Sequence, residues 1–502
     1  MSYLALILLL AQSVPSGRAP AEPTSIGPLP AETATDAALD VKKIVDVFLA
    51  AESEAADPVP PEQVFYQGTI PGMLRTLDPH SIFFDPDQFQ SLQQMQKSET
   101  KGFGTIVSVL PGRVFILQTM PGTPSAKSGL AAGDEIIAIN NIPLANLEMD
   151  QLIELMTASR QRQAGLDVRR PGNIRLFHLI LTPELVDSPS VDRAFLLKPG
   201  VGYIRISSFE NATAKLVKDA IEKLGGDHLN GLVIDLRNNP GGATQAASGI
   251  ASLFLQSDQL IYTIKGRNMK TEEVRAPKYS TPYTFPIAIL TNEKSASASE
   301  ILTGALQDHD RAVVIGDSTF GKGLVQNVFP LAHNTGIALT VAYYYTPSGR
   351  SIQKPLPSGI LDSSKIAPVG DFHTDAGRPV KGGGGIQPDQ VIAPESLSQL
   401  EAVLDASGVL TAFAGEYVQS HEIGANFEAS SAILDQLQLF LSGRNIRPGI
   451  NEWLRDREWI QSRLKQEVLN LKFGVARGDE VDMQRDPIVQ AAVRAVTSAP
   501  RK

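Results

Sequence analysis

Gly231-Leu232-Val233-Ile234-Asp235-Leu236 is a continuous apolar run that leads into a polar, glycine-rich turn, Asn238-Asn-Pro-Gly-Gly242. Two more apolar runs follow at residues 286–291 and 312–316, and the stretches 212–224, 246–255 and 299–307 have helical patterns. Uninterrupted apolar strands that alternate with helices are typical of an α/β sheet with both faces covered. We therefore expect such a sheet at the centre of the chain.

Composition narrows the function classes. The 502 residues are 42% hydrophobic and 20% charged, with a formal net charge of −9, which argues against nucleic-acid binding. The absence of cysteine excludes disulfides, thiolate nucleophiles and cysteine-ligated metals. The seven histidines lack metal-ligand spacing, and we expect neither a metal nor an organic cofactor.

The N-terminus has the pattern of an export signal. Residues 3–11 are apolar but too few to span a membrane, and small residues and Pro15 follow. We expect a signal peptide at 1–19, although no basic residue precedes the apolar run. Pro, Ala and Thr then make 20–35 a linker.

The flanking regions differ in pattern from the centre. Residues 36–98 read as helical, with Asp78 or Ser81 as a cap for the next helix, and 397–502 read as helical with a break at Arg447-Pro-Gly449. Residues 355–385, rich in Pro, Gly, Ser and Asp, have the composition of an exposed insertion or a mobile loop.

A small β/α module occupies residues 99–184. Strands are expected at 105–109, 114–118, 135–139 and 177–181, and helices at 125–129 and 149–158. The loop Gly102-Phe103-Gly104, ahead of Thr105 and Ile106, can present backbone N–H groups to a terminal carboxylate, so that a peptide adds to the sheet edge.

A serine and a lysine carry the candidate chemistry. Ser297 lies in Ser295-Ala-Ser-Ala-Ser-Glu300, and Lys322 follows 25 residues later in Thr319-Phe-Gly-Lys-Gly323. A serine hydroxyl needs a base, and lysine can be that base only when neutral. At a pKa of ~10.4 about one lysine in 2,500 is neutral at pH 7, so burial must lower this pKa by roughly three units.

Other residues could complete this site. The amides of the Gly241-Gly242 turn suit one half of an oxyanion hole, and Gln326, four residues after Lys322, could orient the amine. The plainer interpretations are that Lys322 is a surface lysine and that the three serines cap a helix. Asp308 suits a structural role, and a His309–Asp308 pair is an unfavoured alternative, because sequence neighbours rarely pair as base and orienting group.

Together these residues resemble the carboxyl-terminal processing proteases, also called tail-specific proteases. The resemblance spans about residues 36–395, and its motifs occur in family order: Leu77-Asp-Pro-His-Ser81, Gly102-Phe-Gly104, Gly129-Leu-Ala-Ala-Gly-Asp-Glu-Ile136, Gly202-Tyr-Ile-Arg-Ile-Ser-Ser-Phe209, Asp235-Leu-Arg-Asn-Asn-Pro-Gly-Gly242 and the two segments that hold Ser297 and Lys322. Residues 157–165 depart from the family turn after the second PDZ helix.

The resemblance implies a multidomain α/β architecture. Its parts are an N-terminal helical region (36–98), an inserted PDZ domain (99–184), a Ser–Lys protease core (185–396) and a C-terminal helical region (397–502). It also implies site roles: Ser297 as nucleophile, Lys322 as general base, Gln326 as the third member, and the amides of Ala298 and of Gly241 or Gly242 as the oxyanion hole.

The implied activity is endopeptidase cleavage of proteins whose C-terminal tails bind the PDZ domain. The implied location is the bacterial periplasm or cell envelope, with an adaptor protein or a homo-oligomer as further partners. The alternatives are a catalytically silent PDZ scaffold of the envelope and a PDZ protease with a Ser–His–Asp triad.

Overall fold

The computed structural model describes residues 31–57, 60–96, 101–160, 162–186, 189–279, 281–355, 370–393 and 395–501. The expected signal peptide and most of the linker lie outside these ranges. Helix α2 (Ala31–Glu54) begins within the last part of the expected linker. None of the helices in the described ranges is both long and apolar enough to cross a membrane.

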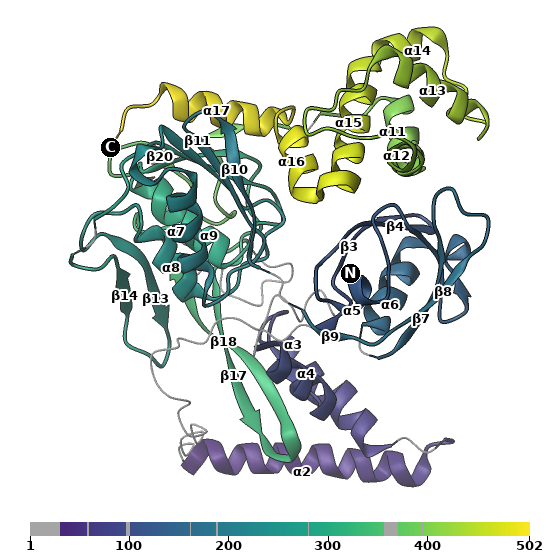
Figure 1. The fold of residues 1–502 in the computed structure, drawn as a ribbon. Coiled ribbons are helices and arrows are strands. Elements are labelled where there is room, and N and C mark those ends of the chain that lie inside the picture. The colour runs from purple at the N-terminus through teal and green to yellow at the C-terminus, as the bar shows by residue number, and fades with distance from the viewer. Residues whose placement is uncertain are drawn as a thin grey trace.

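A six-stranded sheet forms the centre of the molecule (Figure 1). Its strand order is β10-β11-β12-β15-β16-β21, and all neighbouring pairs are parallel except β10 and β11. The strands are β10 (Val191–Lys198), β11 (Val201–Ile206), β12 (Gly231–Asp235), β15 (Ile287–Thr291), β16 (Ala312–Gly316) and β21 (Gln390–Val391). The three apolar runs of the sequence are therefore adjacent parallel strands.

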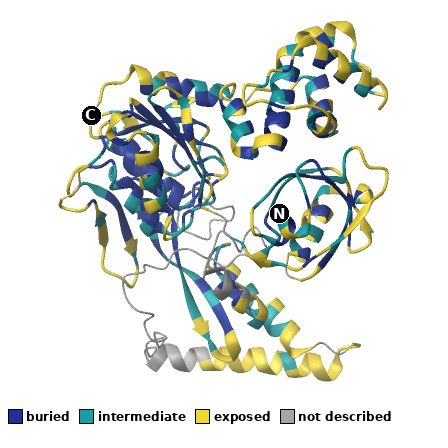
Figure 2. Cartoon of the chain, viewed as in Figure 1, coloured by how far each residue is buried: buried dark blue, intermediate teal, exposed yellow. Residues whose placement is uncertain are grey.

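Helices cover both faces of this sheet, as expected. On one face, α7 (Thr213–Leu224), α8 (Thr244–Ala251) and α9 (Ala298–Asp308) pack on side chains such as Ile234 and Ile289. The other face, with Val233 and Leu290, is covered by α17 (Pro487–Ser498), near the end of the chain. Figure 2 shows the sheet and these inner helix faces as buried. The C-terminal helix is thus part of the central layer structure.

A second, antiparallel sheet joins the centre to the N-terminal region. Strand β18 (Thr335–Tyr345) pairs with β17 (Leu324–Leu331) along one edge and with β1 (Ile82–Phe84) and β13 (Leu260–Gly266) along the other. Strand β14 (Glu272–Arg275) pairs with β13. In Figure 1 the β17–β18 hairpin reaches from the centre toward α2.

Strand β1 corrects the expectation for residues 78–81. The N-terminal region holds α2, α3 (Ile70–Arg75) and α4 (Pro86–Gln96), but β1 stands between α3 and α4. Asp78 and Ser81 therefore do not cap a helix. They form a turn into β1, where Phe83 and Phe84 are buried and the backbone pairs with β18.

The inserted module contains the expected strands and helices and two more strands in its sheet. Its sheet has the order β3-β4-β5-β7-β8, with α5 (Pro124–Lys127) and α6 (Met149–Ser159) beside it. The additional strands are β6 (Ile142–Pro143), which pairs with β5, and β7 (Ala164–Arg169), which begins within the segment that departs from the family turn. The others are β3 (Thr105–Leu110), β4 (Arg113–Thr119), β5 (Glu135–Ile139) and β8 (Phe177–Leu181), and β2 (Lys101–Gly102) pairs with β9 (Glu184–Leu185).

The C-terminal region consists of helices that precede α17, the helix that covers the sheet. The expected break at residues 447–449 lies between α13 and α14. The region comprises α11 (Gln399–Ala406), α12 (Val409–Ser420), α13 (Ser431–Ser442), α14 (Ile450–Arg455), α15 (Arg457–Phe473) and α16 (Val475–Met483). The inserted module contacts this bundle, and Arg113 Nη1 donates to Ser407 O at 2.6 Å. Of the expected insertion, residues 356–369 lie outside the described ranges.

Candidate active site

Ser297 lies in a strained turn between β15 and α9. It is the N-cap residue of α9, with φ 55° and ψ −112°. A non-glycine residue in this conformation costs on the order of 1–3 kcal/mol and persists only where its surroundings impose it. Such strain at a strand-to-helix turn is a feature of nucleophile sites rather than of ordinary helix caps.

The two neighbouring serines help to hold this turn. Ser295 Oγ donates to Leu236 O at 2.7 Å, and Ser299 Oγ donates to Asn239 O at 3.0 Å. The backbone N–H of Ala296 also donates to Asn239 O, at 3.0 Å. Ser295 and Ser299 thus fasten the Ser297 turn to the end of β12, which goes beyond the capping role of the plainer interpretation.

The glycine turn after β12 lies directly against Ser297. Gly241 has φ +102°, and a Cβ there would lie 2.8 Å from Ser297 Cβ and 2.9 Å from Ala298 N. Its own amide donates to the side chain of Asn239 at 2.8 Å. Gly242 forms a parallel β-bridge with Phe209. The hydrogen bonds of this bridge are made by the residues on either side of Gly242, so the amide of Gly242 takes no part in them. Ala298 is the first residue of α9, where backbone N–H groups have no intrahelical acceptor.

Lys322 is buried beside this turn, with 5% of its surface exposed. Burial lowers the pKa of its amine to about 8, and the charge of Glu300 acts in the opposite direction. Gly321 has φ +88°, and a Cβ there would lie 3.0 Å from Lys354 Cβ and 3.2 Å from Gly385 N. The glycine beside Lys322 thus lets residues 354 and 385 close over the lysine loop, and Lys322 is not a surface lysine.

Glu300 joins the Ser297 turn to the Lys322 loop. Its Oε2 accepts the backbone N–H groups of Ser297 and Lys322, both at 2.9 Å. Its Oε1 accepts from Gly321 N at 2.7 Å and from Thr319 Oγ1 at 2.5 Å. Burial raises the pKa of this carboxyl, and these hydrogen bonds oppose the rise. Glu300 was not among the predicted site residues, although the Ser-x-x-Glu spacing of a capping box was a signal in the sequence.

Gln326 is also buried, with 3% exposed, near the start of β17. Its side-chain Nε2 donates to the backbone oxygen of His80 at 2.6 Å. Burial and the charge of Lys322 lower the pKa of the His80 imidazole, with Asp78 opposing. The N-terminal turn therefore reaches the same site as Lys322 and Gln326, which no sequence pattern revealed.

His309 lies at the far end of α9 from Ser297. It is the C-cap residue, and its Nδ1 is 2.7 Å from Asp375 Oδ2. An eleven-residue helix is about 16 Å long, so His309 is out of reach of the Ser297 hydroxyl. The His309–Asp308 alternative for a catalytic triad is therefore wrong.

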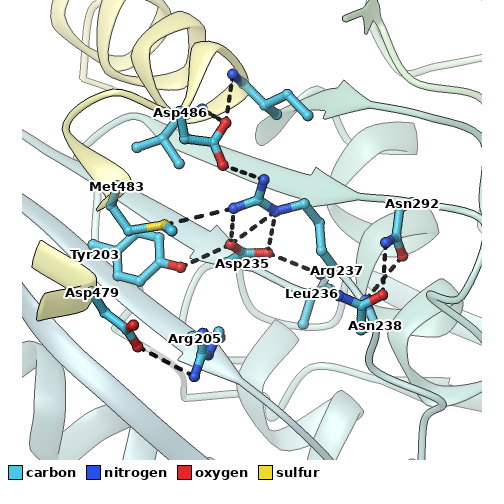
Figure 3. A network of polar contacts seen from close by, with 12 residues as sticks. Tyr203, Arg205, Asp235, Leu236, Arg237, Asn238, Asn292, Asp479, Met483 and Asp486 are labelled. Atoms are coloured by element: carbon cyan, nitrogen blue, oxygen red, sulfur yellow. Dashed lines mark hydrogen bonds and ion pairs between the residues drawn. The ribbon is translucent and has the colours of Figure 1, made fainter. Parts of the chain in front are cut away.

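A buried ion-pair network supports the glycine turn from the other face of the sheet (Figure 3). Arg237 contacts Asp235 and also Asp486, the N-cap residue of α17. Tyr203 donates to Asp235 at 2.8 Å, and Asn292 donates to Asn238 at 3.0 Å. The network thus links α17 to the strand end that carries the turn.

Comparisons with known proteins show the family of this chain. The peptidase family S41 model matches residues 200–363, and the PDZ domain model matches residues 92–168. The carboxyl-terminal-processing protease of Synechocystis sp. is 36% identical over 306 residues, which are 59% of this chain and 71% of that protein. This chain belongs to the carboxyl-terminal processing protease family. It is a serine-type peptidase with a PDZ domain.

Other known proteins are also similar to this carboxyl-terminal processing protease. The Bartonella bacilliformis carboxy-terminal-processing protease is 33% identical, covering 59% of this chain and 68% of that one. The solved structure of a photosystem II D1 C-terminal processing protease is 26% identical in sequence. The match covers 70% of this chain and 86% of that chain, with a TM-score of 0.41.

In the PDZ domain, Thr105 and Ile106 of the predicted peptide-binding segment lie at one edge of the sheet, whereas Gly102 pairs with Glu184 in the separate β2–β9 sheet. Strand β3, with Thr105 and Ile106, is the terminal strand and pairs with β4 along one side. The carbonyls of Phe103 and Gly104 accept bonds from within the domain, from Ser125 N at 3.0 Å and Met120 N at 2.8 Å. This carboxyl-terminal processing protease thus has a sheet edge at which a strand could add.

Proposed function

We propose that the chain is an endopeptidase with Ser297 as nucleophile and Lys322 as general base. The observation that carries the proposal is the burial of Lys322, which lowers its pKa to about 8. At that pKa about one amine in ten is neutral at pH 7, against about one in 2,500 for an ordinary lysine. The base is therefore available at physiological pH.

The proposed reaction forms an acyl-enzyme. Lys322 takes the hydroxyl proton of Ser297 as the oxygen attacks the peptide carbonyl, and Gln326 orients the amine. The amides of Ala298 and Gly242 stabilise the oxyanion, because Gly241 N is already bonded to Asn239. Lys322 then protonates the leaving amine, and water hydrolyses the acyl-enzyme.

Substrates are selected by their C-terminal tails in this proposal. The tail adds as a strand to β3, with its carboxylate at the amides of Gly102, Phe103 and Gly104. Within the described residues β3 pairs with β4 alone, and the carbonyls of Phe103 and Gly104 accept hydrogen bonds from within the domain, which supports this assignment.

The cellular setting is an extension of the same proposal. The apolar N-terminal run supports export to the periplasm or cell envelope, where an adaptor protein could deliver substrates. Helix α2 supports self-assembly, because large apolar side chains along it are exposed to solvent (Figure 2). These are Leu39, Val41, Ile44, Val45, Val47 and Leu49.

The test is to incubate wild type, Ser297→Ala and Lys322→Ala with an unfolded protein that ends in an apolar tail. Mass spectrometry should show fragments with wild type alone. Full activity in either variant would contradict the proposal. If wild type bound the tail without cleaving it, the silent PDZ scaffold would be favoured.

A further inference from the structure

The motif Leu77-Asp-Pro-His-Ser81 forms a tight turn whose shape is set by one buried side chain. Asp78 is 2% exposed, and its Oδ1 accepts the backbone N–H groups of His80 and Ser81, each at 2.8 Å. Its Oδ2 accepts from Ser81 Oγ at 2.7 Å. An aspartate that bonds the backbone two and three residues ahead fixes a turn.

This turn forms hydrogen bonds with two residues, Gln326 on β17 and Thr340 on β18, that lie opposite each other in the strand pair. His80 O accepts from Gln326 Nε2 at 2.6 Å, and Ser81 Oγ accepts from Thr340 N at 3.3 Å. Gln326 and Thr340 are register partners. The turn therefore fixes both sides of the strand pair at the position of Gln326.

The strand pair is irregular at this position. Val325 is opposite Ala342 but Gln326 is opposite Thr340, so β18 carries an extra residue between them. Such a bulge twists the strands locally and changes the direction of side chains. Gln326 therefore needs a contact outside the ladder to define its orientation, and His80 O supplies one.

The contact also determines which way the Gln326 amide faces. A backbone carbonyl can only accept a hydrogen bond, so the nitrogen of the amide must face His80. The amide oxygen must then lie on the other edge of the group. A glutamine held in this way offers an acceptor to a neutral amine, which is the role assigned to it beside Lys322.

We propose that the turn from Asp78 to Ser81 is a positioning element of the active site, in which Asp78 shapes the turn and His80 O orients Gln326. The inference rests on the proposed Ser–Lys–Gln function. Asp78 acts through other residues and is a positioning residue. The effect of Lys322 on the imidazole of His80 agrees with the closeness of this turn to the base.

The test compares Asp78→Ala, Asp78→Asn, Gln326→Ala and the double variant Asp78→Ala/Gln326→Ala of the full chain. Asp78→Ala should lower kcat about 10-fold or more and change KM less than about twofold. Asp78→Asn keeps the oxygen that accepts both amides and should retain most of the activity. In the Gln326→Ala background, Asp78→Ala should cause less than about a twofold further loss.

Three results would overturn the proposal. Equal losses from Asp78→Ala with and without Gln326 would show that the turn acts independently of it. A rise in KM with unchanged kcat would place the turn in substrate binding. If the His80→Ala variant were inactive and the Asp78→Ala variant active, the positioning role would belong to the imidazole of His80 and not to the turn.

Folding and the dyad itself have separate controls. Thermal unfolding of each variant shows whether it is folded. If Asp78→Ala does not fold, Ser81→Ala replaces it, because that change removes the side-chain hydrogen bonds of Ser81 Oγ with Asp78 Oδ2 and Thr340 N but keeps His80 O. An active Lys322→Ala enzyme would refute the Ser–Lys function. Additive losses in an enzyme that needs Lys322 would refute only the positioning role.

Discussion

The two ends of helix α9 each carry a buried carboxylate, but the two carboxylates are stabilised in different ways. Asp308, at the C-terminal end, pairs with the buried guanidinium of Arg350 at 2.6 Å. Glu300, in the first turn, accepts three backbone amides and the Thr319 hydroxyl. An arginine stays charged at all physiological pH values, so the first arrangement is structural.

One helix thus combines a rigid end with an end that adjoins the proposed catalytic residues. At the Asp308 end a permanent ion pair fixes the loops. At the Glu300 end the carboxylate organises backbone, while burial lowers the pKa of the nearby Lys322 to about 8. A group that must exchange a proton needs a pKa near the working pH.

The largest expected effect comes from replacing Lys322 with a residue that is always charged. Lys322→Arg should lower kcat/KM by about 10³-fold or more, because a guanidinium cannot serve as a base at neutral pH. Steady-state cleavage assays measure this loss. Lys223→Arg, an exposed change at the end of α7, is the matched control and should behave as wild type. Activity within tenfold of wild type would exclude Lys322 as the base.

A change at the Asp308 end of the helix should alter the free energy of unfolding. Asp308→Ala leaves the Arg350 charge buried without its carboxylate, and we expect a loss of about 3–5 kcal/mol in the free energy of unfolding. Urea titration measures it, with the exposed pair residue Asp219→Ala as control. A loss below about 1 kcal/mol would mean that the two ends do not differ as described.

Glu300→Gln should mainly affect the reaction. The amide nitrogen cannot accept the backbone N–H groups that the carboxylate oxygen accepts, so the two loops lose register and kcat should fall about 10- to 100-fold. Because the charge of Glu300 raises the pKa of Lys322, its loss should also move the acidic limb of the kcat/KM profile to lower pH. Glu272→Gln, on the surface, is the control. If the acidic limb of the kcat/KM profile did not move, Glu300 would be protonated in the resting enzyme.

Removing the Lys322 amine should instead stabilise the fold. Folding lowers the pKa of Lys322 from an ordinary value of 10.5 to about 8, so the buried charge destabilises the fold fully below pH 8. This cost decreases as pH rises from 8 to 10.5 and is absent above that range. Lys322→Met should therefore be more stable than wild type by up to about 3 kcal/mol at pH 7, and the gap should narrow by pH 10. Urea unfolding at the two pH values measures it, and a constant gap would contradict the shifted pKa.

The sequence by itself determined the architecture and the candidate residues. Apolar runs that must be buried on both faces predicted the parallel strands, because their period and length leave few other folds. The residue types around Ser297 and Lys322 predicted a dyad without histidine. The Ser-x-x-Glu spacing was present as well, but a capping box by itself does not indicate that Glu300 also reaches the lysine loop.

Only the tertiary structure decided how distant segments meet. Contacts between residues hundreds of positions apart, such as Gln326 with His80 and Arg237 with Asp486, leave no periodic signal in one chain. The same holds for α17 on the second face of the sheet, since its apolar stripe fits many partners. The shift in the pKa of Lys322 is likewise a property of burial, which depends on everything that closes over the side chain rather than on its neighbours in sequence.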